Sequence, residues 1–308
     1  MITSMTTLAH GDPYATECYS KAAILASLAA HTVANSVKAG ARLADLCLLG
    51  DRLIAEQCLE AVNQGICHPT TCQRNSTVAN HAPFNSDQLV IPGDIVKIEV
   101  GAHINGYGAV VGINAPSSAD LGFEDASGLV DEAKVVASRV LQAIKPGAKA
   151  WDITRDINEY LAETPYTGVI GMAGHNHSQW DIQGPKTINL FPTKEQLADP
   201  ANDVIFEEGE VYTIEVWLTD AANGQPSTES NLETTLYLYQ GGIMEINVDV
   251  LSKQARALAA QCQAQFRSLP FHRRELPSTV SEEGLDVLAK QGALAIYSPI
   301  DPRLMAWL

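Results

Sequence analysis

Two glutamates occupy matching places in two short runs of strand-forming residues. Glu99 lies in Val-Lys-Ile-Glu-Val, and Glu215 lies in Tyr-Thr-Ile-Glu-Val. On a half-buried strand a carboxylate between apolar neighbours needs a partner, because a lone buried charge is costly. His103 and His177 lie near the same segments. Paired acids with a nearby histidine predict either a metal site or an acid–base pair. The competing interpretation is that both glutamates face solvent.

The two glutamates belong to an internal repeat. The segment KAGARLADL at 38–46 aligns with KPGAKAWDI at 145–153, and PGDIVKIEV at 92–100 aligns with EGEVYTIEV at 208–216. Two homologous halves, each helix–helix–strand–strand, would pack about a pseudo-twofold axis, with helices on the outer face of a central sheet. This arrangement places Glu99 and Glu215 across one cleft. Chance similarity is the alternative.

The composition limits the class of protein and its partners. Of the 308 residues, 46% are hydrophobic and 18% are charged, which is typical of a folded globular chain. The net charge of −16 disfavours nucleic acid and anionic membranes as partners. No apolar run is long enough for a membrane span, and the N-terminus has no basic segment followed by an apolar core. We therefore expect a cytoplasmic protein whose six cysteines are buried thiols.

The elements that position these residues follow from hydrophobic periodicity and turn signals. Residues 65–87 read as a loop, because Pro69, Asn75, Asn80 and Pro83 interrupt the pattern. The predicted helices are 17–38, 43–62, 128–144, 152–162, 248–268 and 280–290, and the predicted strands are 95–100, 107–113, 168–172, 211–218, 234–239 and 294–297.

Several motifs in this order resemble the pita-bread fold of the methionine aminopeptidase superfamily, peptidase family M24. They are NHAPFNSD, PGDIVKIEVGAHINGYGAVV, GMAGHNHSQWDIQGPKT and EEGEVYTIEVW. The resemblance is to the type 2 branch and to the proliferation-associated, curved DNA-binding proteins, which lack peptidase activity. It implies an α/β (α+β) fold with a pseudo-twofold antiparallel central sheet covered by helices. It also implies a single domain over 1–308, with a small helical insertion at 245–292.

The resemblance implies a damaged metal centre. In the active family, bridging carboxylates hold two metal ions ~3.5–4 Å apart. The family's first aspartate falls on Glu99 and its second on Val110, which cannot bind a metal. Its histidine falls on His175 and its first glutamate on Glu215. No Glu follows Glu283 in this sequence, so the last bridging ligand is expected to be missing.

The other pocket positions of the family are partly retained. His81 matches a histidine that lies against the substrate, and the second such histidine is replaced by Gln183. His103 and His177 are further candidates for substrate binding, and the competing interpretation is that they are structural. We expect no metal cofactor. The alternative is one divalent transition metal bound by Glu99, His175 and Glu215.

These residues predict an aminopeptidase-like protein that has lost its dinuclear metal site and its peptidase activity. Its cleft would bind a small molecule or peptide. His175, Glu215, Glu99 and His81 would be available for metal-independent acid–base chemistry such as isomerisation, cyclisation or elimination. The alternatives are a ribosome- or nucleic-acid-associated adaptor and a mononuclear-metal hydrolase. A homodimer is compatible with the sequence, and neither the ligand nor the existence of a reaction is fixed by it.

Overall fold

The fold is described from a computed structural model of the chain. Its described residues are 2–7, 11–58, 63–84, 86–117, 123–220, 224, 226–227, 232–240 and 252–302. The helices are α1 (Pro13–Asn35), α2 (Leu43–Gln57), α3 (Phe123–Ala143), α4 (Ala150–Leu161), α5 (Lys194–Ala198), α6 (Lys253–Phe266) and α7 (Glu282–Lys290). The strands are β1 (Ile2–Thr7), β2 (Gln64–Arg74), β3 (Ile95–Ile104), β4 (Tyr107–Pro116), β5 (Thr167–Gly168), β6 (Gly174–His177), β7 (Thr187–Ile188), β8 (Val211–Val216), β9 (Leu218–Thr219), β10 (Pro226–Ser227), β11 (Leu236–Tyr239), β12 (Pro270–His272), β13 (Leu294–Tyr297) and β14 (Asp301–Pro302).

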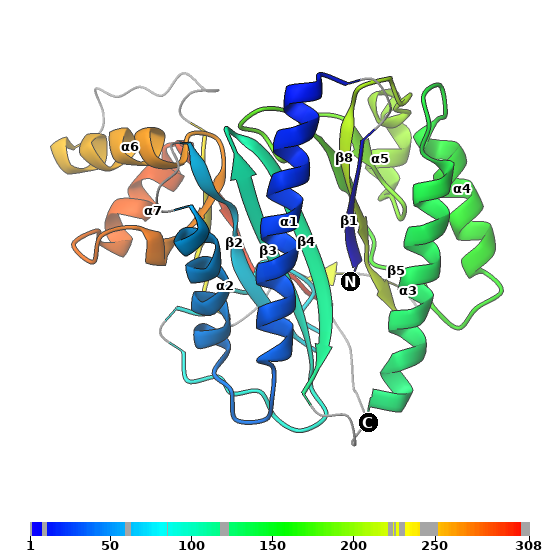
Figure 1. Cartoon of the computed structure of the whole chain (residues 1–308), viewed down its shortest axis with the longest axis horizontal. Coiled ribbons are helices and arrows are strands. Elements are labelled where there is room, and N and C mark those ends of the chain that lie inside the picture. Colours follow the sequence, from blue (N-terminus) through cyan, green and yellow to red (C-terminus); the bar gives the residue numbers. More distant parts are fainter. Residues whose placement is uncertain are drawn as a thin grey trace.

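A central sheet carries two pairs of helices on one face. Its strand order is β2-β3-β4-β1-β8-β6-β7, and its pairs are antiparallel. Figure 1 shows α1 and α2 beside β2, β3 and β4, and α3 and α4 beside β8. The helices bury one apolar side against the strands, which leaves the opposite face of the sheet for a cleft. This is the α/β pita-bread arrangement predicted from the sequence.

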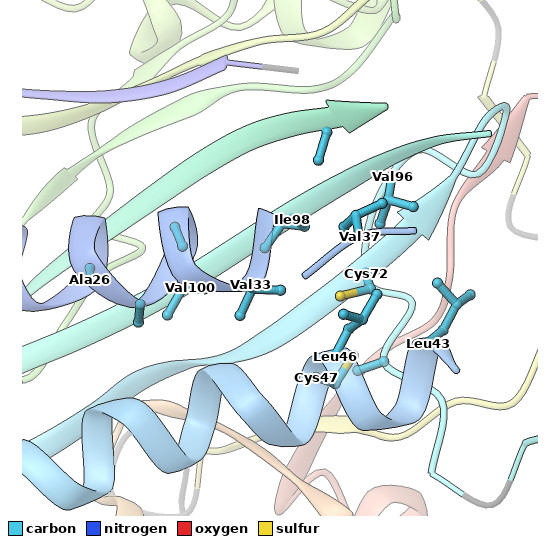
Figure 2. Close-up of a cluster of buried hydrophobic side chains, with 14 of the residues drawn as sticks. Ala26, Val33, Val37, Leu43, Leu46, Cys47, Cys72, Val96, Ile98 and Val100 are labelled. Atoms are coloured by element: carbon cyan, nitrogen blue, oxygen red, sulfur yellow. The ribbon is translucent and has the colours of Figure 1, made fainter. Parts of the chain in front are cut away.

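Each half of the molecule has its own hydrophobic core between helices and sheet. In the first half, Val33 on α1 and Leu46 on α2 pack with Ile98 on β3 (Figure 2). In the second half, Val140 on α3 and Ile157 on α4 belong to a corresponding cluster that contains residues of β8. Two similar cores, one under each half of the same face of the sheet, agree with the internal repeat.

The repeat is confirmed by matched backbone hydrogen bonds before the second helix of each half. The Gly40 amide donates to the carbonyl of Val90 at 2.8 Å, and the Gly147 amide donates to the carbonyl of Phe206 at 2.8 Å. Both glycines have φ near +85°, a conformation that other residues adopt only at a cost. The similarity between 38–46 and 145–153 therefore reflects equivalent structure rather than chance.

The central position in the sheet is filled by a strand that we did not predict. In the repeat, β8 of the second half is equivalent to β3 of the first. Since β4 pairs with β3, the repeat predicts a strand that pairs with β8 at the equivalent position. The place is taken by β1, which pairs with β8 from Ile2↔Val216 to Thr7↔Val211 and with β4 at Thr3↔Gly112. Strand β1, from the N-terminal part of the described chain, thus completes the pseudo-symmetric sheet.

The predicted loop at 65–87 is wrong, because β2 covers its first part. The strand is irregular: its register with β3 shifts between Ile66 and His68, and again between His68 and Thr71. Pro69 lies within this bulged stretch, where a missing N–H is tolerated. The bulges disturbed the alternation of side chains that would have indicated a strand. The predicted strand 168–172 is also reduced to Thr167–Gly168.

The C-terminal segment forms a separate cluster beyond β2. Helices α6 and α7 pack on a sheet of order β12-β11-β13 (Figure 1). It is joined to the first half by Arg274, whose Nε donates to Asp51 Oδ2 at 2.6 Å and whose Nη2 donates to the Thr70 carbonyl at 2.9 Å. Helices are present in the predicted insertion at 245–292, but its first residues lie outside the described part. No helix in the described part is long and apolar enough to cross a bilayer.

Candidate functional site

A cavity of about 340 Å³ lies between the two halves and draws its lining from both. Glu99 lines it from β3, His175 from β6 and Glu215 from β8, so three of the four predicted catalytic residues meet in one space. Among the described lining residues there is no lysine or arginine. The lining consists of His68, Ala79, Asn80, Glu99, Val110, Gly171, Met172, Ala173, His175, His177, Ile182, Gln183, Thr187, Asn189, Gln196, Asn202, Thr213, Glu215, Trp217, Tyr297 and Ile300.

The register of the sheet explains why the two glutamates share this cavity. Glu99 pairs with Gly112, Gly112 with Thr3, and Thr3 with Glu215, which makes one continuous row across four strands. Laterally paired residues place their side chains on the same face of a sheet. Glu99 and Glu215 are separated by three strand spacings of roughly 4.8 Å each. The repeat and the completing strand β1 therefore set two carboxyl groups on opposite sides of one cleft floor.

Glu99 is held by neighbours on β2. It is only 6% exposed. Its Oε2 accepts hydrogen bonds from Thr71 Oγ1 and from Gln73 Nε2, both at 3.3 Å. Gln73 Nε2 also donates to Thr71 Oγ1 at 2.7 Å, which fixes the two donors relative to each other. Two donors on one oxygen restrain the side chain.

Glu215 is in a different environment and favours its neutral form. Burial and, to a smaller extent, the nearby Glu99 carboxylate raise the pKa of Glu215 to about 8, although a hydrogen bond from Trp217 opposes the shift. Trp217 Nε1 donates to Glu215 Oε2 at 3.1 Å. At neutral pH the cleft therefore holds a protonated carboxyl group, which can donate a hydrogen bond to a ligand or exchange a proton with it.

The two histidines on β6 are both neutral at pH 7. Burial lowers the pKa of His175 and brings that of His177 to about 4. His177 Nδ1 lies 2.9 Å from the Gly108 carbonyl and must donate to it, so Nε2 accepts from the Thr213 hydroxyl at 2.6 Å. Both ring nitrogens of His177 are thus engaged within the chain, and its substrate-binding role stays a prediction. His175 also lines the cavity, and a hydrogen bond with the Gly184 backbone opposes the lowering of its pKa.

Val110 occupies the position at which the family resemblance implies an aspartate. It is 7% exposed and belongs to a small apolar cluster with Cys67, Ile182 and Leu269. In the described part of the chain, no group of three or more His, Cys, Asp or Glu side chains is arranged to hold a metal ion. Glu99, His175 and Glu215 line the cavity without forming such a group. The donors among the described residues do not fit the two-metal centre that the family implies.

The remaining predicted ligand-binding residues have separate places. Gln183 lines the cavity. Its Oε1 accepts a hydrogen bond from the Tyr297 hydroxyl, which places Gln183 at the part of the cavity wall next to β13. His81 and His103 are buried and are not among the described lining residues. His81 Nδ1 is 3.2 Å from the Cys72 carbonyl, and the His103 ring packs 5.0 Å from that of Trp180. Their substrate-binding roles stay predictions.

Two of the polar lining residues that the sequence did not single out have a side-chain atom without a partner among the described residues. The Oδ1 atom of Asn189 and the Nδ1 atom of His68 are buried without a hydrogen-bond partner. His68 was overlooked because β2 was interpreted as a loop. Asn189 follows β7 in a short segment without a motif, and only its three-dimensional hydrogen bonds single it out. Both add hydrogen-bonding capacity that the chain itself leaves unused.

Comparison with known proteins places this geometry in a family. The profile of metallopeptidase family M24 matches residues 17–251. ERBB-3 binding protein 1 of Arabidopsis thaliana is 29% identical over 288 residues, which cover 91% of this chain and 71% of the relative. Proliferation-associated protein A of Dictyostelium discoideum is 27% identical over 297 residues, 93% of this chain and 75% of the relative. The solved structure of a thermophilic Arx1 has a TM-score of 0.81 at 20% identity, covers 96% of this chain and 85% of that chain, and supports the fold.

Proposed function

This chain belongs to metallopeptidase family M24, and we propose that it is a non-hydrolytic member whose central cleft binds a small molecule or the end of a peptide. The family and its methionine aminopeptidase-like branch, with proliferation-associated relatives, confirm the resemblance predicted from the sequence. The loss of the dinuclear metal site and the ligand are parts of the proposal.

One observation carries the proposal: the cleft keeps Glu99, His175 and Glu215 around an apolar Val110. A two-metal peptidase needs bridging carboxylates to hold both ions and to generate the attacking hydroxide. A valine in an apolar cluster cannot bridge. The retained polar groups still provide a cation-attracting carboxylate, a protonated carboxyl group and a neutral histidine, which together suit ligand recognition.

Acid–base exchange with the ligand is compatible with the same cleft. A carboxyl group with a pKa of about 8 is suited to donate or accept a proton near neutral pH. Glu215 would exchange the proton, and His175 would position the ligand beside it. We propose that this cleft operates in the cytoplasm without a metal cofactor.

The test uses the whole protein and the tripeptide Met-Ala-Ser as probe. Isothermal titration calorimetry should show binding of the tripeptide by the wild type, and weaker binding by Glu215→Gln. Chromatography of the same mixtures with added Mn²⁺ or Co²⁺ should show intact tripeptide. The matched control is Glu159→Gln, an exposed glutamate on α4 whose replacement should leave binding unchanged. Release of free methionine, or absence of binding by the wild type, would contradict the proposal.

A second candidate function is that of an adaptor. It is favoured by the identity to ERBB-3 binding protein 1 of Arabidopsis thaliana, which is named for a protein partner. For this chain the partner would be a protein, because the net charge of −16 disfavours nucleic acid. Affinity purification followed by mass spectrometry, with and without Met-Ala-Ser, distinguishes the two: an adaptor captures a partner independently of the tripeptide.

A further inference from the structure

A chain of hydrogen bonds orients the amide of Asn189 at one wall of the cleft. Asn202 Nδ2 donates to the Gln196 carbonyl at 3.0 Å, so Asn202 Oδ1 is the acceptor for the Thr187 hydroxyl at 3.5 Å. With its proton committed to Asn202, Thr187 Oγ1 accepts from Asn189 Nδ2 at 2.7 Å. This polarity points the nitrogen of the Asn189 amide at Thr187 and its oxygen away from Thr187.

This orientation leaves an unsatisfied acceptor in the cleft. Asn189 is 1% exposed and lines the cavity, and its Oδ1 has no hydrogen-bond partner among the residues that the structure describes. The residue is also held at its main chain, because Thr154 Oγ1 donates to the Asn189 carbonyl at 2.7 Å. A buried acceptor without a donor is costly, and native proteins rarely leave one unless something else satisfies it. A ligand N–H or O–H group would remove that cost.

The same row of the sheet relates Asn189 to the glutamates. His175 pairs with Thr213 on β8 and with Thr187 on β7. Continuing both registers by two residues brings Ala173 beside Glu215 on one side and beside Asn189 on the other. The Cα atoms of Glu215 and Asn189 are then about two strand spacings, roughly 10 Å, apart. A small alanine lies between them, so an extended ligand can contact both.

The charges of the lining residues determine which sign of charge the ligand should carry. Glu99 and Glu215 are acidic, and the described lining residues include no lysine or arginine to pair with an anionic group. Two acidic side chains without a basic one favour a cation over an anion, and Asn189 Oδ1 and His68 Nδ1, which have no partner among the described residues, add uncharged hydrogen-bonding atoms. The cleft thus offers acceptors to a ligand rich in donors.

We propose that Asn189 is a specificity-determining residue and that the cleft selects a protonated primary amine carrying a second N–H donor. The ammonium group lies beside Glu215, whose proton passes to solvent when the cation binds, and the second donor reaches Asn189 Oδ1. This inference rests on the proposed binding function of the cleft and adds the chemistry of the ligand. A free diamine and the amidated end of a short peptide share this chemistry, whereas a free amino acid brings a carboxylate that the lining does not pair.

Calorimetric titration with 1,4-diaminobutane tests the inference, with 1,4-butanediol as the uncharged match and Ala-Ala amide as the peptide source. The diamine or the amide should bind at least about tenfold more tightly than the diol, as charge-assisted hydrogen bonds are the stronger ones. Comparing the affinity for 1,4-diaminobutane with that for Ala-Ala amide shows whether the cleft prefers a free diamine or an amidated peptide. Equal binding of diol and diamine overturns the inference.

Two variants at Asn189 separate recognition from structure. Asn189→Leu removes the acceptor and should weaken amine binding about tenfold, whereas Asn189→Asp keeps an acceptor, adds a negative charge and should strengthen it. A purely structural residue would lose affinity in both variants. Unchanged or equally weakened binding in both overturns the inference.

The failure of the inference is distinguishable from the failure of the proposed function. If Met-Ala-Ser binds in a Glu215-dependent manner and the diamine and Ala-Ala amide do not bind, the cleft function stands and the amine selectivity is wrong. If the binding of Met-Ala-Ser and of the diamine is the same in the wild type, Glu215→Gln and the control Glu159→Gln, the cleft is not the site and both proposals fall.

Discussion

The wild type should lose free energy of unfolding as pH rises, and Glu215→Gln should abolish the part of this loss that is due to Glu215. Glutamine keeps the shape of the side chain and mimics the neutral carboxyl group permanently. The folded-state pKa of Glu215 is about 8, above the ordinary value of 4.5. The folded protein therefore binds more protons than the unfolded chain between these values, and wild-type stability falls as pH rises from 4.5 to 8.

The size of this effect follows from the pKa. At about 1.4 kcal/mol for each pKa unit, the full difference is roughly 5 kcal/mol. Because the side chain is partly open to the cavity, solvent screening reduces this, and we expect about 2–3 kcal/mol. The free energy of unfolding of Glu215→Gln relative to the wild type should rise by that amount between pH 4.5 and pH 9.

Urea denaturation followed by circular dichroism at pH 4.5, 7 and 9 measures the difference. Other groups titrate in both proteins, so the comparison isolates Glu215 and its interaction with Glu99. Glu159→Gln, on the exposed side of α4, is the matched control and should show no trend with pH. A difference between Glu215→Gln and wild type that stays constant from pH 4.5 to pH 9 would refute a neutral, buried Glu215.

Three further substitutions test buried contacts of the fold. Val110→Asp places a carboxylate in an apolar cluster and should lower the free energy of unfolding by about 3 kcal/mol. Added Mn²⁺ should raise the Tm of this variant more than that of the wild type. An unchanged free energy of unfolding would contradict the burial of Val110. Arg274→Met leaves Asp51 without its ion-pair partner and should cost about 3–5 kcal/mol in urea denaturation, whereas a neutral result would mean that this link is dispensable. Gly50→Ala puts a methyl group 2.3 Å from Thr70 Oγ1 and should destabilise by about 1–3 kcal/mol despite the better helix propensity of alanine; a gain in Tm would be inconsistent with this contact.

The sequence predicted the parts of the fold that repeat. Glu99 and Glu215 could be paired because similar residues flank them, and the equivalent turns at Gly40 and Gly147 carry the same backbone hydrogen bonds. Their shared cavity follows from this symmetry. The family motifs further led to His175 and to the apolar Val110.

Other features depend on contacts that a linear pattern does not contain. Strand β1 pairs with β8, although some two hundred residues separate them in the chain, and nothing local to Ile2–Thr7 indicates that partner. Strand β2 was missed because its bulges break the alternation of side chains. Asn189 stands out only through the direction of the hydrogen bonds from Thr187 and Asn202.

Metal stoichiometry tests the central claim most directly. The purified protein would be incubated with excess Mn²⁺ or Co²⁺, dialysed, and measured by native mass spectrometry and elemental analysis, with Glu215→Gln alongside. A cleft that works without a dinuclear centre predicts fewer than one bound ion per chain and no difference between the two proteins. Two ions per chain in the wild type, lost in Glu215→Gln, would contradict the account.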